Sequence, residues 1–296
     1  MNKKLKKEFV ELIKNNSEKE YVDYLEKMPE KELKGLSIKI IELLKEKDLS
    51  DRIKKWNDFE VKLSEIKNLH LLSNPFYIGY GNPNSDILFL GKEKAFDITN
   101  SPDLFLHESI NNNKQWECLI ENWNSNLEFN PLFPQKYFGE NFKIKHTHTW
   151  GMYYKLVKGI TENPNITSEL EVLENNFFNH CFTTEVNHIP SKYSSNLKSI
   201  DPRKELLQHA FYKSFKYVII GAIGSIDKEQ IKEIFNCFEP KEMLLNKKGS
   251  KKERKINVFQ NETQKIILCN QLSGAAGWSN EEIENLITEI KYDITK

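Results

Sequence analysis

The pattern of apolar and polar positions changes near residue 70 of this 296-residue chain. Before that point apolar residues recur three and four positions apart, as at Phe9, Leu12 and Ile13, which predicts amphipathic helices. Beyond it, short continuous apolar runs alternate with helical patterns. Continuous runs of this length are typical of strands that are buried on both faces of a parallel sheet. The four predicted strands lie within residues 86–91, 177–184, 217–221 and 265–270.

The alternation of strands and helices predicts an α/β fold. Helical patterns lie near residues 150–160, 203–214, 227–237 and 280–293. We expect a three-layer sandwich with a central, mostly parallel four-stranded sheet, plus an N-terminal α-helical extension. The expected division of the chain is a charged helical extension over residues 1–68 and an α/β domain over residues 69–296.

Composition and charge exclude several classes of protein. The 43 Lys and Arg balance the 43 Asp and Glu, so the formal net charge is zero, which neither requires nor excludes a nucleic-acid partner. No apolar run approaches the ~20 residues that span a bilayer, and the charged N-terminus lacks the apolar segment of a secretory signal. Four scattered cysteines form no CxxC pair, which argues against a disulfide scaffold or a cysteine zinc site. We therefore expect a cytoplasmic protein with reduced thiols and no membrane partner.

Polar residues follow the predicted strands, at the edge of a parallel sheet where ligands bind. Gly91 ends the first strand, and Glu93 follows two positions later. A carboxylate there can position a water or stabilise positive charge on a sugar, or it can belong to a solvated loop of alternating charges. After the second strand, Asn187 offers both a donor and an acceptor, so it can read the edge of a base. Alternatively, Asn187 and His188 cap a turn.

Three further segments have a functional and a structural interpretation. The loop 270–279 carries small residues before a helix that Ser279 and Glu282 cap; it can approach a phosphate or simply close the sheet. Segment 241–256 holds seven Lys or Arg against two Glu, and it is either a phosphate-neutralising loop or an ordinary exposed loop. His146 and His148 lie two apart without an acidic or cysteine partner at ligand spacing, so no metal site is expected.

Together these strand ends resemble the uracil-DNA glycosylase superfamily over about residues 74–293. Residues 86–93 are similar to the family's first motif, in which a strand ends in Gly and a polar or acidic residue follows. Residues 270–274 fall where the family carries its second catalytic motif, commonly His-Pro-Ser. Lys94 stands where the first motif usually has Pro, and Asn270 begins an Asn-Gln-Leu sequence in place of His-Pro-Ser. The chain therefore resembles a divergent member with altered catalytic motifs.

The resemblance implies a monofunctional DNA glycosylase that hydrolyses the N-glycosidic bond of a flipped, modified or damaged base. Ionised Glu93 would stabilise the oxocarbenium-like sugar and orient a water, and Asp97 would replace Glu93 if that side chain were turned away. Asn270 would bind the departing base or a flanking phosphate. The implied reaction needs no metal or organic cofactor.

The resemblance also implies a binding surface for single- or double-stranded DNA. Phe96 would stack on the base, and Asn187 or Thr184 would read its edge. Leu272 would fill the gap left by the flipped nucleotide. The remaining residues expected at the DNA backbone are Gly91, Ser273, Gly274, Lys247, Lys248, Lys251 and Lys252.

Two other functions stay open from the sequence. The first is a catalytically inactive module of the same fold that binds nucleic acid or a nucleotide. The second is an interaction protein that captures a protein partner through the N-terminal helices, which are rich in charges of both signs.

Overall fold

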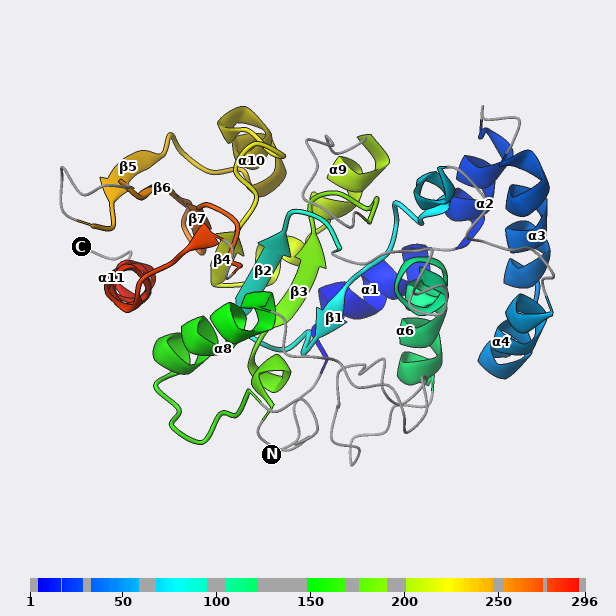
Figure 1. Cartoon of the computed structure of the whole chain (residues 1–296), viewed down its shortest axis with the longest axis horizontal. Coiled ribbons are helices and arrows are strands. Elements are labelled where there is room, and N and C mark those ends of the chain that lie inside the picture. The colour runs from blue at the N-terminus through cyan, green and yellow to red at the C-terminus, as the bar shows by residue number, and fades with distance from the viewer. Residues whose placement is uncertain are drawn as a thin grey trace.

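The computed structural model shows a mixed α/β fold with a seven-stranded sheet (Figure 1). Helices pack on the sheet, and further helices lie beside it toward the N-terminal end of the chain. In the part of the chain that the structure describes, no helix is both long and apolar enough to cross a membrane. The described residues are 5–16, 18–28, 33–58, 68–94, 105–121, 148–168, 176–190, 201–246, 253–273 and 276–292.

Four mutually parallel strands form the centre of the sheet. In spatial order they are β3 (Phe182–Glu185), β2 (Ile87–Gly91), β4 (Tyr217–Ile220) and β7 (Lys265–Leu268). β2, β4 and β7 lie within predicted strand segments, and β3 ends at Glu185, one residue beyond its predicted segment. The second prediction began too early, because residues Phe177–His180 form a 3-10 turn, η4, ahead of β3.

Antiparallel strands complete both edges, so the expected number of four strands is wrong. β1 (Tyr80–Gly81) pairs with β3, while β6 (Lys255–Gln260) pairs with β7 and β5 (Lys241–Leu244) pairs with β6. β1 has only two residues, which is too short for a periodic pattern. β5 is largely exposed and begins with two charged residues, so it gives no apolar signal. Segment 241–256 therefore contains β5 and the start of β6, although the sequence suggested a loop.

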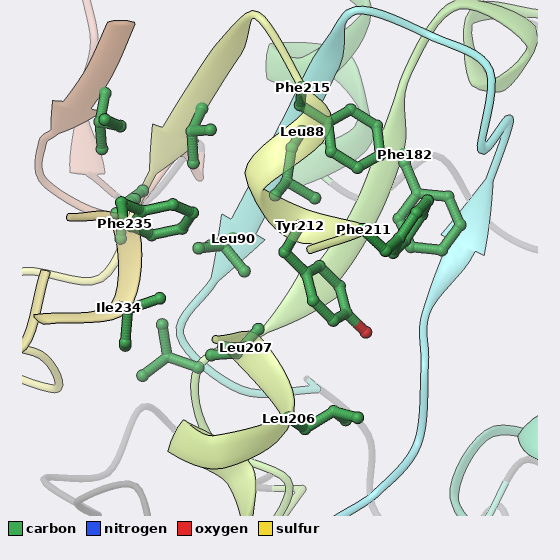
Figure 2. Close-up of a cluster of buried hydrophobic side chains, with 14 of the residues drawn as sticks. Leu88, Leu90, Phe182, Leu206, Leu207, Phe211, Tyr212, Phe215, Ile234 and Phe235 are labelled. Carbon is green, nitrogen blue, oxygen red and sulfur yellow. The ribbon is translucent and has the colours of Figure 1, made fainter. Parts of the chain in front are cut away.

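Alternate residues of the central strands face opposite sides of the sheet. Leu88 and Leu90 of β2 face a core that Figure 2 shows in part. The helices that supply this core are α1 (Lys7–Asn15), α6 (Asn112–Glu121), α9 (Asp201–Leu207) and α10 (Lys228–Phe235). Ile87 and Phe89 face a second core, supplied by α8 (His148–Thr161) and α11 (Asn280–Lys291). Both faces of the parallel strands are therefore covered.

The N-terminal helices are integrated into this packing. The ring of Phe9 in α1 lies 4.9 Å from Trp116 and 4.7 Å from Phe211, inside the core of the sheet. Three more helices form a third core together with Phe105, Leu106 and Ile110. The expected boundary at residue 68 therefore does not coincide with a boundary in the packing. These three helices are α2 (Glu18–Glu26), α3 (Lys34–Leu44) and α4 (Leu49–Asn57).

Candidate functional site

The loops that follow β2 and β3 lie against each other at the carboxyl edge of the sheet. The backbone N–H of Val186 donates to the carbonyl of Gly91 at 2.9 Å, and the N–H of Asn187 donates to that of Lys92 at 2.9 Å. Strand pairing therefore continues past the ends of both strands. It places Glu93 beside the loop that contains Asn187. Ligands of open α/β sheets bind at this edge.

The carboxylate of Glu185 occupies the space above Gly91. A Cβ atom at Gly91 would overlap this carboxylate, so a larger residue there would force the Glu185 side chain to move. Glu185 Oε2 is buried and accepts no hydrogen bond from any residue within the described ranges. The pKa of Glu185 is raised to about 8, chiefly by burial; the charge of Lys94 opposes this shift and that of Glu93 favours it.

Lys94, which is buried, and Glu108, which is partly buried, lie close together next to this carboxylate. Lys94 is 5% exposed, and its Nζ donates to the Glu108 carbonyl at 2.6 Å and lies 3.5 Å from the centroid of the Tyr77 ring. Burial lowers the pKa of Lys94 and raises that of Glu108, and the attraction between the two charges opposes both shifts. Glu108 lies on η3 (Leu106–Ile110), a short π-helical segment, a geometry that is frequent at functional sites.

Arg203 of α9 (Asp201–Leu207) donates hydrogen bonds to several segments of the site. Its guanidinium is fully buried and donates to the Glu185 carbonyl through Nε at 2.9 Å and Nη2 at 2.7 Å. It also donates to the carbonyl of Tyr77 and to the hydroxyl of Thr184. The hydroxyl of Thr184 is therefore used inside the protein, and it is poorly placed to read a base.

The structure brings some of the predicted site residues together and separates others. Gly91, Glu93 and Asn187 lie at the ends of adjacent strands, and Glu93 is only 9% exposed. Asn270 follows β7, which is two strands away from β2, or about 10 Å at the usual strand spacing. Its side chain is exposed. Asn270 therefore lies on the same edge as Glu93 without being next to it.

Leu272 does not lie where a wedge residue would. It is 2% exposed and belongs to the core beneath α8 and α11. A Cβ added at Gly221 would lie 3.3 Å from Leu272 Cγ, so the leucine side chain fills the space that this glycine leaves. Insertion of Leu272 into a base stack would require it to leave that core. Ser273 is partly exposed, and its carbonyl accepts from the N–H of Ala276 at 3.0 Å.

Seven predicted residues lie outside the described part of the chain, but the flanks of the basic segment are visible. Asn246 donates to Glu282 Oε1 at 2.8 Å and accepts from the N–H of Arg254 at 3.0 Å. Arg254 in turn lies 3.2 Å from Glu282 Oε2. These contacts fix both flanks beside the start of α11, at the carboxyl end of β7. The seven residues are Phe96, Asp97, Gly274, Lys247, Lys248, Lys251 and Lys252.

Sequence reasoning missed the roles of Glu185, Lys94, Glu108 and Arg203. A charged residue at the end of an apolar strand was a usable signal for Glu185. Glu108 and Arg203 lie on helices whose positions depend on the fold, so no local pattern indicates either residue. Among the residues whose placement is described, no three His, Cys, Asp or Glu side chains are arranged to bind a metal ion.

Comparisons with known proteins found no match: no protein-family model, no curated protein and no solved structure matches the chain.

Proposed function

We propose that the protein is a DNA glycosylase of the uracil-DNA glycosylase type, which hydrolyses the N-glycosidic bond of a flipped base. The observation that supports this is the position of Glu93. It lies nearly buried at the carboxyl end of the central strand β2, beside the loop that carries Asn187. The two covered faces of the parallel strands support the three-layer arrangement that the resemblance implies. Four free cysteines are compatible with a reducing cytoplasm, where we place the activity.

In the proposed reaction the target nucleotide leaves the base stack, at a cost of a few kcal/mol, and enters the edge formed by β2 and β3. As the bond between C1′ and the base nitrogen breaks, positive charge develops on the sugar. The Glu93 carboxylate stabilises this charge and accepts the proton of the attacking water. A partly desolvated carboxylate does this more strongly than one in water, because the local dielectric is lower. Asn187 would read the edge of the base, and because its side chain is 1% exposed it must turn outward to do so.

The DNA backbone would be held at the same edge. β6 is antiparallel to β7, so the connection between β5 and β6 emerges at the carboxyl end of β7. That connection contains Lys247, Lys248, Lys251 and Lys252. Lysines that neutralise phosphates release counterions, so affinity for DNA should fall steeply as salt rises. A flat salt response would argue against a role for these lysines.

The test is base release by the purified protein from single- and double-stranded oligonucleotides that carry uracil, hypoxanthine or bulkier modified bases. Glu93→Gln should slow release on the order of 100-fold or more while DNA binding persists. Glu229→Gln is the matched control, because Glu229 is exposed on α10 and is not one of the proposed site residues. Equal activity of the Glu93→Gln and Glu229→Gln proteins would contradict the assignment of Glu93.

The alternative function is a module of this fold that binds nucleic acid without catalysis. The burial of Leu272 favours it, since that residue would otherwise serve as the wedge. Binding without base release, lost on neutralising Lys247, Lys248, Lys251 and Lys252, would support this alternative. If the protein showed no base release and no DNA binding, that result would contradict both functions.

A further inference from the structure

We propose that Glu185 donates a proton to the departing base, and that the substrate is therefore a purine or purine-derived base rather than uracil. The inference rests on the proposed function and names the substrate class of the same site. It starts from a buried carboxyl group whose presence the fold does not explain.

The position of Glu185 suits a group that acts on a ligand. It ends β3, and Glu93 follows the end of β2, the adjacent strand. Gly91 leaves room for the carboxyl group directly above its Cα atom. A buried carboxylate with a structural role normally accepts hydrogen bonds from backbone N–H groups or cations. Oε2 of Glu185 accepts none from the residues described here, and Arg203 bonds its backbone carbonyl instead.

The surroundings of Glu185 keep a proton on it at neutral pH. Desolvation is the largest influence, and the negative charges of Glu93 and Glu108 act in the same direction. The positive charges of Lys94 and Arg203 oppose them without reversing the outcome, and the resulting pKa of Glu185 is about 8. The other titratable groups that face it are the neutral hydroxyls of Tyr77, Tyr80 and Tyr153.

Glu93 and Glu185 would then have different roles in the reaction. Two carboxyl groups that share a buried site do not both ionise cheaply, so one keeps a proton. Where the surroundings push the pKa values of two carboxyl groups apart, one commonly acts as the acid and the other as the base. Here Glu185 is the acid, and Glu93 is the carboxylate that faces the sugar and the water.

The proton on Glu185 indicates which class of nucleobase the site can release. Uracil can leave as an anion whose charge spreads over its ring, whereas a purine departs readily only after a ring nitrogen is protonated. The chain has Asn270 rather than an imidazole after β7, and an amide cannot give up a proton to a purine. Glu185 lies at the same edge and can do so.

The step balances in atoms and charge. The Glu185 proton moves to a ring nitrogen of the base, and the electrons of the bond from C1′ pass to the base, which leaves neutral. Water adds its oxygen to C1′ and gives its proton to Glu93. The products are the free base and a sugar hydroxyl at C1′. The proton on Glu93 then returns to Glu185 directly or through solvent, and no other reactant is needed.

The experiment compares wild-type protein with Glu185→Gln on three oligonucleotides. Hypoxanthine needs protonation to leave, 7-methylguanine already carries a positive charge, and uracil can leave as an anion. We expect Glu185→Gln to slow hypoxanthine release by about 100-fold, the usual size of general-acid catalysis. Release of 7-methylguanine, corrected for its spontaneous loss, should change less than tenfold. Hypoxanthine release by the wild-type protein should also fall above about pH 8, and 7-methylguanine release should not.

Other outcomes would overturn the inference. Equal slowing of hypoxanthine and 7-methylguanine would show that Glu185 acts only through the structure. Release of uracil but of neither purine would reject the substrate class and leave the proposed glycosylase intact. Release of no base would reject both. If Glu185→Gln does not fold, Glu185→Asp replaces it, since aspartate keeps the acid but shortens its reach, and the same selective loss is expected.

Discussion

At the scale of single residues, the carboxylate of Glu185 lies against Gly91 at the ends of two adjacent parallel strands. Glycine at the end of an apolar run predicts a sharp turn or a close approach, and the structure shows a close approach by a carboxylate. The partner in that contact was not predictable, because it comes from a strand that is adjacent in space and distant in sequence. The local sequence pattern identifies Gly91 as a position of close approach. Only the register between β2 and β3 identifies Glu185 as the residue that approaches it.

Replacing Gly91 by alanine should destabilise the protein. The new methyl group would push the Glu185 carboxylate aside, and because this is the end of a flexible side chain the cost should lie near the lower end of the about 1–3 kcal/mol of overpacking. Urea unfolding measures the change. Gly35→Ala is the matched control: this helical glycine has nothing within 4 Å of the added methyl, so alanine should stabilise by about 0.5–1 kcal/mol. Equal effects at both positions would contradict the overlap.

The same reasoning explains why Leu272 and Thr184 differ from their predicted roles. An apolar residue in a loop has the same pattern whether it faces solvent or a core, and Leu272 packs next to Gly221. A threonine at a strand end has a free hydroxyl only if no donor reaches it. Arg203, supplied by a later helix, is that donor.

At the scale of elements, the four apolar runs were predictable and the edge strands were not. Runs of Val, Ile and Leu identify strands that are buried on both faces. Edge strands such as β5 bury little, so the hydrophobic pattern says nothing about them. The amphipathic pattern of α1 was equally clear, but periodicity does not reveal which core receives the apolar face.

Phe9→Ala tests whether α1 belongs to the core of the sheet. Removal of this buried ring should cost about 3–5 kcal/mol, because it contacts Trp116 and Phe211. The whole sheet should unfold at lower urea in a single transition, followed by far-ultraviolet circular dichroism. Glu11→Ala, on the exposed side of the same helix, should change stability by less than about 0.5 kcal/mol. If α1 melted alone and left the main transition unchanged, the helix would be peripheral.

Arg254→Met tests the anchor between the β5–β6 hairpin and α11. Arg254 is buried, pairs with Glu282, and lies over the ring of Trp278 at 4.1 Å. Without Arg254 the Glu282 carboxylate loses its cationic partner but keeps hydrogen bonds from Asn246 and from the N–H of Ser279, so the cost should lie near the lower end of the about 3–5 kcal/mol of a broken buried pair. The adjacent Lys255 pairs with Glu242 at the surface, and both side chains are 52% exposed. Lys255→Met should therefore change the unfolding free energy by less than about 1 kcal/mol, and similar losses in both variants would contradict the anchor.

At the scale of the whole molecule, the buried titratable groups make stability depend on pH in opposite directions. Burial lowers the pKa of His107 to about 4 and of His188 to about 3. The unfolded chain binds protons at these histidines below about pH 6.5, so acid destabilises the fold there. Glu185 acts in the opposite sense, because its pKa is raised from 4.5 to about 8 and the folded protein holds the extra proton.

The contribution of Glu185 is isolated by subtracting the unfolding free energy of Glu185→Gln from that of the wild-type protein at each pH. This difference should fall as pH rises from about 5 to 8, by about 1 kcal/mol per unit at its steepest. Groups that do not interact with Glu185 cancel in the subtraction, whereas Glu93, Lys94 and Glu108 contribute through their interaction with it. Glu239→Gln, at an exposed residue after α10, supplies the control substitution for this subtraction. A difference that rises with pH would mean that Glu185 is ionised in the fold.

The place of β2 between β3 and β4 affects the chain while it is being synthesised. Both parallel neighbours of β2 are made after it, at Phe182 and Tyr217. At a synthesis rate of about 5–20 residues per second, β2 remains without a parallel neighbour for on the order of 5–20 seconds. During that interval the nascent chain exposes a strand with two unpaired edges, which is a template for aggregation. We therefore expect ribosome-bound chains that end between residues 91 and 182 to depend on a chaperone.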